Sequence, residues 1–175
     1  MRLFIAILLD KEMKNALRGI QNGFRRRGVE GNYTPLENLH LTLAFIGEYP
    51  DPDAVREAME TLRFEPLPLK LSGVGAFGDT WWAGLEENAQ LDALARRLRR
   101  ALAERGVPFD RKSFRPHVTL LRKASYRGRE PLAPPQLPCA EMRAERISLM
   151  LSERGRSGML YTELASVPAS PEEKA

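Results

Sequence analysis

The alternation of hydrophobic and polar positions divides the chain into strands and helices. Residues 2–9 form an almost continuous apolar run, which is typical of a strand covered on both faces. Asp10 follows where a helix N-cap is expected, and apolar side chains then recur at helical spacing until Gly28, which ends the predicted helix. The chain is therefore expected to begin with a buried strand and an amphipathic helix.

The same pattern predicts two further helices and six further strands. The helices are expected over residues 51–62 and 88–106. The strands are expected at residues 39–46, 67–74, 81–85, 116–122, 142–152 and 159–167. A proline-rich connection precedes the last two strands, and residues 168–175 are expected to form a disordered tail. Residues 1–167 are therefore expected to form one domain of mixed α/β (α+β) class.

The order of elements repeats along the chain. The letters RGV end the first predicted helix at residues 27–29 and the third at residues 105–107, and a histidine follows each arginine by 13 or 12 positions. A short apolar strand precedes each of these helices. We interpret the chain as two similar lobes related by a pseudo-two-fold axis, which would bring the two histidines to opposite walls of one cleft.

The two histidines of the chain stand in the same four-residue frame. The segments HLTL at 40–43 and HVTL at 117–120 each place a threonine two positions after the histidine. Residues i and i+2 share one face of a strand, so each motif presents an imidazole and a hydroxyl together. Displacement at a phosphodiester needs one imidazole to accept a proton and another to donate one. The similar motifs predict this pair of groups but leave open which histidine is the base.

Other residues could complete such a site. Thr42 and Thr119 are expected to bind phosphate oxygens, and Arg122 is expected to stabilise the charge on them. Arg122 lies five positions after His117, so in an ideal strand it would face the other way and needs a bulge, a bend or a strand end to reach the cleft. Arg115 is a further candidate for the site.

The aromatic side chains and the arginine clusters each allow two interpretations. The rings of Tyr33, Phe77, Trp81 and Trp82 either stack on a nucleobase or pack in the core. The clusters at residues 25–27 and 96–100 either attract RNA or cover helix surfaces. The basic residues number 27 against 23 acidic ones, giving a net charge of +4, and most are arginines, whose planar fork matches phosphate oxygens. The charge balance therefore favours a phosphate-bearing partner, with a solvated arginine-rich surface as the alternative.

The composition also limits location and cofactors. No apolar run approaches the length of a membrane span. The single cysteine, Cys139, excludes an internal disulfide, which fits a cytoplasmic protein. No metal site is expected, because neither histidine has a partner at ligand spacing and the nearby Glu37 and Glu48 fall in flanking loops. No glycine-rich phosphate loop or serine elbow occurs.

Several segments resemble the two-histidine phosphoesterase superfamily, and within it the bacterial and archaeal RNA 2′,3′-cyclic phosphodiesterases, also called 2′-5′ RNA ligases. They are RLFIAI at 2–7, ENLHLTL at 37–43, FIGE at 45–48, GVGAF at 73–77, and FRPHVTL at 114–120 with Arg122. The likeness spans nearly the whole chain. It implies a bilobal fold in which two antiparallel sheets line a basic central cleft, with the helices outside.

The resemblance also implies an activity. Water would open a 2′,3′-cyclic phosphate at an RNA end, leaving a 2′-phosphate, without a metal ion or other cofactor. His40 would donate a proton to the leaving 3′-oxygen, His117 would accept the proton of water, and Thr42, Thr119 and Arg122 would hold the phosphate. A weak, reversible 2′-5′ ligation is an expected side reaction. The expected partners are cyclic-phosphate-ended RNAs, tRNA fragments among them, bound by a monomer.

Two alternatives remain open at this point. One is a phosphodiesterase that acts on a small cyclic nucleotide or another cyclic phosphate. The other is an RNA-binding module whose histidines no longer catalyse a reaction. The family often has Leu-Ala-Arg after the second threonine where this chain has Leu120-Leu121-Arg122. This difference leaves the expected catalytic groups unchanged.

Overall fold

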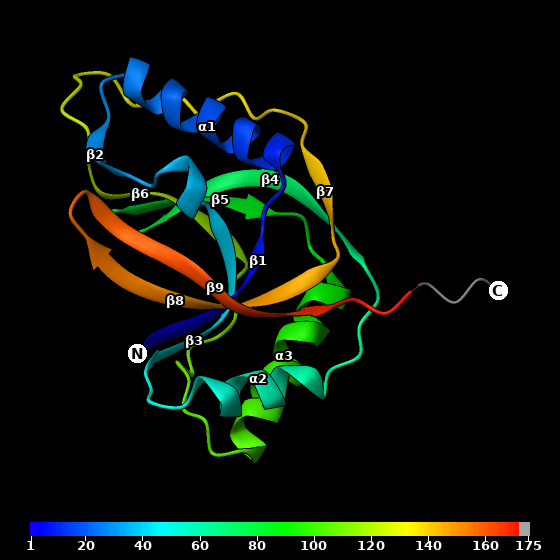
Figure 1. The fold of residues 1–175 in the computed structure, drawn as a ribbon. Helices are drawn as coiled ribbons and strands as arrows, with labels where there is room; N and C mark the ends of the chain where they lie inside the picture. Colours follow the sequence, from blue (N-terminus) through cyan, green and yellow to red (C-terminus); the bar gives the residue numbers. More distant parts are fainter. Residues whose placement is uncertain (172–175) are drawn as a thin grey trace.

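Two antiparallel sheets form the centre of the computed structural model, which describes residues 1–171. The four-stranded sheet has the order β3-β1-β8-β9, formed by β1 (Arg2–Leu8), β3 (His40–Glu48), β8 (Arg146–Gly155) and β9 (Gly158–Pro168). The five-stranded sheet has the order β2-β6-β5-β4-β7, formed by β2 (Glu30–Tyr33), β4 (Leu67–Phe77), β5 (Thr80–Leu85), β6 (His117–Ser125) and β7 (Glu141–Ala144). Figure 1 shows the two sheets and the helices outside them. The predicted fold class is confirmed.

The three helices begin at the capping residues that the sequence indicated. In α1 (Lys11–Arg26) the carboxylate of Asp10 accepts a hydrogen bond from the backbone N–H of Met13 at 2.8 Å. In α3 (Ala89–Glu104) the side chain of Asn88 accepts one from the N–H of Leu91 at 3.0 Å. The short helix α2 (Pro52–Glu60) begins with a proline at its first position. A 3₁₀ turn, η1 (Leu36–Asn38), precedes β3.

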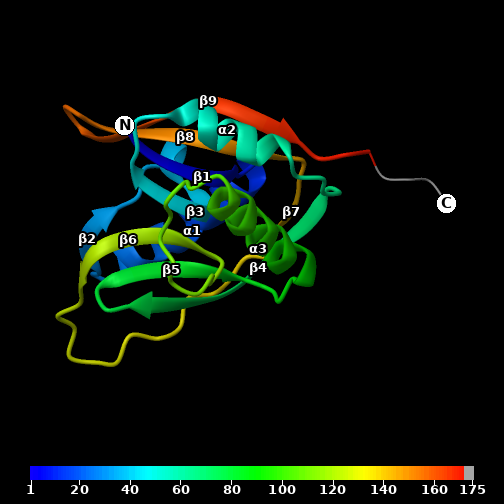
Figure 2. The same cartoon turned by 90° about the horizontal axis from the view of Figure 1, so that it is seen from below.

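Each long helix follows a strand of one sheet and packs against the other sheet. Helix α1 follows β1 but lies on β6 and β7, whereas α3 follows β5 but packs on β3 beside α2 (Figures 1 and 2). The buried Gln21 joins α1 to the five-stranded sheet, because its Nε2 donates to the carbonyl oxygens of Thr34 at 2.9 Å and Leu120 at 2.8 Å. The pairing of β3 with β1 in one sheet matches that of β6 with β5 in the other.

Both faces of β1 are buried, as its continuous apolar pattern predicted. Leu3, Ile5 and Ile7 belong to the large core cluster, which also holds the leucines of α3. Phe4 and Ala6 face the opposite way and pack with Met150 of β8, Phe45 of β3 and Tyr161 of β9 in a smaller cluster. This second cluster forms the floor beneath one of the two histidines. None of the described helices has the length and apolar character needed to cross a membrane.

The structure differs from the predicted elements in three places. The single strand predicted over residues 142–152 is wrong: β7 pairs with β4 and β8 pairs with β1, so the chain changes sheets at Glu145. Strand β2 and the turn η1 were not predicted, because most of their side chains are polar or exposed. β9 runs through Pro168, one residue into the expected tail, and the N–H groups of Ala169 and Ser170 donate to the carbonyl oxygens of Glu145 and Phe64, each at 2.7 Å. The rest of that tail, residues 172–175, lies outside the described residues.

Candidate active site

A β-bulge in β6 brings Arg122 to the face that carries His117. The pairing advances by two residues on β6, from Thr119 to Leu121, while β5 advances by one, so Leu120 is an extra residue. Leu120 and Leu121 are both buried in the core, and the alternation of faces resumes one position later. Arg122 therefore lies on the cleft side despite its odd spacing from His117.

Strand β3 carries the same irregularity at the equivalent place. Its pairing with β1 advances by two residues at Leu43 while β1 advances by one. Phe45 therefore faces the same side as His40 and Thr42. It occupies the position in the first motif that Arg122 occupies in the second.

A neighbouring strand provides a cation on this side of the cleft. The guanidinium carbon of Arg2 lies 5.1 Å from the centre of the Phe45 ring, in a cation–π contact. Arg2 and Phe45 line the same hollow as His40 and Arg122. The two motifs are thus alike in backbone geometry but differ in where their positive charge originates.

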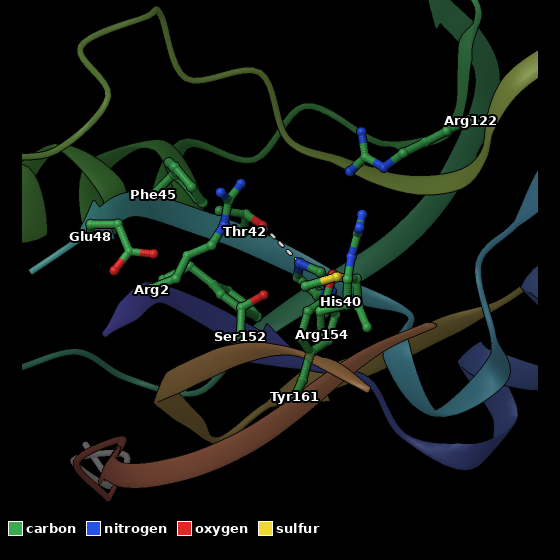
Figure 3. A pocket seen from close by; sticks show the side chains of 11 residues that line it. Arg2, His40, Thr42, Phe45, Glu48, Arg122, Ser152, Arg154 and Tyr161 are labelled. Atoms are coloured by element: carbon green, nitrogen blue, oxygen red, sulfur yellow. Dashed lines mark hydrogen bonds between the residues drawn. The ribbon is translucent and has the colours of Figure 1, made fainter. Parts of the chain in front are cut away.

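Two adjoining hollows lie between the sheets. The first, the His40 hollow, has a volume of about 620 Å³ and is lined by His40, Thr42 and Arg122 with side chains from β1, β8 and β9 (Figure 3). The second, the His117 hollow, has a volume of about 560 Å³ and is lined by His117 and Arg115 with side chains from residues 110–114. Thr42 and Phe45 line both hollows, so the two cavities meet at these residues.

Hydrogen bonds fix the orientation of the His40 ring. Nδ1 lies 2.7 Å from the carbonyl oxygen of Asn38, which can only accept, so Nδ1 carries a proton. Nε2 lies 2.9 Å from the Thr42 hydroxyl, the contact drawn as a dashed line in Figure 3. The buried side chain of Asn38 donates to the carbonyl oxygen of Met159 at 2.9 Å, which ties this turn to β9. A neutral His40 therefore presents Nε2 as its acceptor.

The His117 ring is held in the same way. Its Nδ1 lies 2.6 Å from the carbonyl oxygen of Arg115, again two residues earlier in the chain. This bond leaves Nε2 as the nitrogen available for proton transfer. Thr119 is half-buried and lines neither of the two hollows, in contrast to Thr42.

Aromatic rings surround both imidazoles. The His40 ring centre lies 4.8 Å from that of Phe4 and 5.3 Å from that of Tyr161, with Tyr161 edge-on. The His117 ring centre lies 5.1 Å from that of Phe77 and 6.0 Å from that of Trp82. Of the aromatic residues singled out from sequence, Phe77 and Trp82 thus lie beside a histidine.

The other two predicted aromatic residues are structural. Trp81 packs edge-on against Phe24 of α1 at 5.2 Å. The hydroxyl of Tyr33 donates to the carbonyl oxygen of Val29 at 2.7 Å, and Arg25 lies 4.0 Å above its ring. Neither side chain lines the two hollows.

Burial lowers the pKa of His40 below its ordinary value of 6.5. The bond to the Asn38 carbonyl opposes this shift, and electrostatic interactions with Arg122 and His117 lower the pKa further. The neutral form of His40 is therefore favoured at pH 7 in the free protein. Arg122 and His117 act on His40 because all three groups face the same region between the sheets.

Comparison with known families accounts for this arrangement. Residues 12–156 match the family model described as the 2′-5′ RNA ligase superfamily. The chain belongs to the 2′-5′ RNA ligase superfamily. The resemblance seen in the sequence is confirmed, and with it the class of enzyme, a cyclic phosphodiesterase of the two-histidine phosphoesterase type.

Individual members of the superfamily match the chain over most of its length. The RNA 2′,3′-cyclic phosphodiesterase of Thermus thermophilus is 34% identical, over 94% of this chain and 88% of the relative. That of Geobacillus stearothermophilus is 32% identical over 77% of this chain, and the match spans only 45% of that longer relative. The crystal structure of Escherichia coli LigT in complex with 3′-AMP is similar with a TM-score of 0.79 and 28% identity, over 97% of each chain.

Several residues that line the His40 hollow were not predicted from the sequence. Arg2, Ser152, Arg154, Met159 and Tyr161 line the His40 hollow but come from β1, β8 and β9, far from either motif. The sequence of β1 did contain one signal. Phe4 is an aromatic residue between Leu3 and Ile5, and because these two belong to the large core, Phe4 faces the side of the sheet that carries the hollow. The hairpin residues carried no comparable signal, because pairing of β8 with β1 is what brings them to the site.

Several arginines of the clusters at residues 25–27 and 96–100, which the sequence analysis considered as RNA-binding groups, instead make hydrogen bonds within the protein. Arg27 and Arg97 donate to the carbonyl oxygens of Ala133 and Arg63, each at 2.6 Å, and Arg99 donates to that of Lys112 at 2.7 Å. These contacts favour the structural interpretation of the clusters, although Arg99 also lines the His117 hollow. Among residues 1–171, no three histidine, cysteine, aspartate or glutamate side chains gather where they could hold a metal ion.

Proposed function

We propose that this protein hydrolyses 2′,3′-cyclic phosphate ends of RNA to 2′-phosphates, with His40 and His117 as its proton-transfer groups. The observation that carries the proposal is the matched orientation of the two rings. Each Nδ1 is bound to a backbone carbonyl, so each Nε2 is left as the acceptor or donor beside adjoining hollows. The names of the relatives support RNA as the substrate.

The chemistry is an in-line displacement at phosphorus. Nε2 of His117 accepts a proton as water attacks, and Nε2 of His40 donates a proton to the leaving 3′-oxygen. The donor and acceptor roles follow the family likeness. Each proton transfer is expected to contribute about 10²–10⁴ in rate. No step in this scheme requires a metal ion.

Substrate binding raises the pKa of His40, so that the ring takes up a proton from solvent before it acts as the acid. In the free protein burial and the nearby cations favour the neutral ring, whose Nε2 accepts from the Thr42 hydroxyl. A bound phosphate brings negative charge beside Arg122, which offsets the effect of the cations and raises the pKa of His40. Once Nε2 carries a proton, the Thr42 hydroxyl is free to donate to a phosphate oxygen instead.

Arg122 and Thr119 are proposed to bind the remaining phosphate oxygens. The guanidinium of Arg122 lies in the His40 hollow, where charge develops on the non-bridging oxygens during attack (Figure 3). Thr119 follows His117 by two positions on the same strand face, and we assign it a contact that forms with substrate.

The direct test is product analysis on an RNA oligonucleotide that ends in a 2′,3′-cyclic phosphate, with a chelator present. Wild-type protein is expected to produce a 2′-phosphate and no 3′-phosphate. His40→Ala and His117→Ala should each reduce the rate by about 10²–10⁴ while keeping the circular dichroism spectrum of the wild type. Absence of the 2′-phosphate, or full activity in either variant, would contradict the proposal.

The same displacement with a ribose 5′-hydroxyl as nucleophile in place of water gives a weak 2′-5′ ligation: the P–O bond to the 5′-oxygen forms as the bond to the 3′-oxygen breaks. Supplying a 5′-hydroxyl oligonucleotide in large excess is expected to yield a small amount of 2′-5′-joined product. The two histidine variants should lose hydrolysis and ligation together, because both reactions use the same proton transfers.

A further inference from the structure

The His40 hollow carries more positive charge than a single phosphate group requires. Three arginines enter it from three different strands: Arg2 from β1, Arg122 from β6 and Arg154 from β8 (Figure 3). Within residues 1–171, no ion pair includes any of these three side chains. Glu48, which also lines the hollow, is paired with the N-terminal amine at 3.2 Å. Glu48 is also directly opposite Arg2 in the pairing of β1 with β3, but its ion pair is with the N-terminal amine, so within residues 1–171 none of the three arginines has an ion-pair partner.

Two of these arginines are close neighbours on one sheet face. Arg2 lies directly opposite Ser152 in the pairing of β1 with β8, and Arg154 is the next residue of β8 on the same face. Diagonal neighbours in an antiparallel pair lie about 7–8 Å apart, within reach of long side chains. Like charges this close repel one another, and an anion bound between them would offset the repulsion.

Arg2 is displaced from His40 along β1. The His40 ring rests on Phe4, which is opposite Met150, and Arg2 lies two residues before Phe4 along β1. Two residues of strand correspond to about 7 Å at 3.3–3.4 Å per residue. This separation matches one nucleotide step of an extended RNA strand. The Arg2 guanidinium contacts the Phe45 ring and makes no hydrogen bond within residues 1–171, so its N–H groups remain available to bind oxygen.

We propose that Arg2 and Arg154 bind the phosphate that precedes the terminal nucleotide of the RNA. This inference rests on the proposed function, and it assigns Arg122 to the cyclic phosphate and the other two arginines to its neighbour. The site would therefore favour an oligonucleotide end over a mononucleotide with the same cyclic phosphate, because only the oligonucleotide carries the second phosphate.

The test compares a 2′,3′-cyclic mononucleotide with a trinucleotide that ends in the same cyclic nucleotide. Wild-type protein should give a higher kcat/KM for the trinucleotide, mainly through a lower KM. Arg2→Gln and Arg154→Gln should each reduce this advantage, and the double variant should abolish it with much less effect on the mononucleotide. Arg156→Gln, in the turn between β8 and β9 and outside both hollows, is the matched control.

The salt dependence gives an independent readout. Each phosphate neutralised on a single strand contributes about 0.7 to the slope of log affinity against log salt concentration. The slope for a non-cleavable trinucleotide, measured by fluorescence anisotropy, should therefore be shallower by about 0.7 in the double variant than in the wild type. The control variant should keep the wild-type slope.

Three outcomes separate the two proposals. Equal wild-type efficiency on both substrates, or equal losses on both in the double variant, overturns the second phosphate site. Absence of turnover on either substrate overturns the proposed function, and the anisotropy slopes then still decide whether Arg2 and Arg154 bind a phosphate. Because Arg154 lies near the exposed end of a hairpin, Arg154→Gln serves as the test if Arg2→Gln fails to fold.

Discussion

Replacing Arg122 by glutamine should change activity and the pKa of His40 in opposite senses. Arg122 is proposed to stabilise the charge on the phosphate, so its removal slows the reaction. The same charge lowers the pKa of His40 in the free protein, so its removal raises that pKa toward its ordinary value. A residue that only supported the fold would not link these two effects.

The size of the rate loss follows from the position of the side chain. Removing one preorganised donor to a developing oxyanion typically costs about 10²–10³ in rate. Arg122 is exposed in the free protein, so solvent screens part of its charge. We therefore expect kcat/KM to fall by about 10², the lower end of this range. Arg122→Lys should lose less, because it keeps the charge but not the planar fork that binds two oxygens.

The measurement combines steady-state kinetics with an NMR titration of the imidazole rings. The chain has only two histidines, so His117→Ala assigns the His40 signal directly. Lys123→Gln is the control, since it removes one positive charge from the next position of β6, outside both hollows. An unchanged pKa of His40, or a loss in kcat/KM below tenfold, would refute the placement of Arg122 beside both His40 and the phosphate.

Three further predictions concern His40 and the support of β6. Saturating inorganic phosphate should raise the pKa of His40 in the same titration, and an unmoved signal would place the anion elsewhere. Because the pKa of His40 is lowered by folding from 6.5, its contribution to stability is complete above about pH 6.5 and is lost as the pH falls toward the lowered value. Urea unfolding should show this loss in the wild type but not in His40→Gln. Gln21→Leu should reduce the free energy of unfolding by about 1–3 kcal/mol, since two carbonyl oxygens, those of Thr34 and Leu120, lose their side-chain donor; unchanged urea unfolding would contradict this.

The sequence predicted those elements whose pattern depends on local residues alone. The cap at Asp10, the helical spacing of α1 and the apolar run of β1 are all encoded within a few neighbouring positions. The change of sheet at Glu145 is not encoded locally, because apolar residues continue on both sides of it. Only the long-range pairing of β7 with β4 and of β8 with β1 separates the two strands. For the same reason Arg154 was not found, since its approach to Arg2 depends on two strands about 150 positions apart.

The position of Arg122 shows a signal that the sequence did contain. Two adjacent apolar residues, Leu120 and Leu121, follow the second threonine, and Leu43 and Ala44 follow the first. A regular strand with one polar face cannot bury two consecutive side chains on the same side, so each doublet marks the place where the alternation shifts. The structure has a bulge at each of these doublets. Unbroken alternation would have placed Arg122 on the opposite face from His117, and the bulge at Leu120 reverses that placement.

The asymmetry needed for acid–base catalysis arises outside the two motifs. Both histidines have the same Nδ1 bond and the same bulge beyond the threonine, so the motifs alone give two equivalent groups. The difference comes from the groups that surround each ring. Burial against β1 and β9 lowers the pKa of His40. In addition, Phe45 stands in the first motif at the position that Arg122 occupies in the second. A group that is neutral in the free protein becomes a proton donor only if the phosphate itself raises its pKa. We therefore propose that substrate binding prepares His40 as the acid, and a pH profile of kcat, which reports the bound state, should place its acidic group at a higher pKa than the profile of kcat/KM.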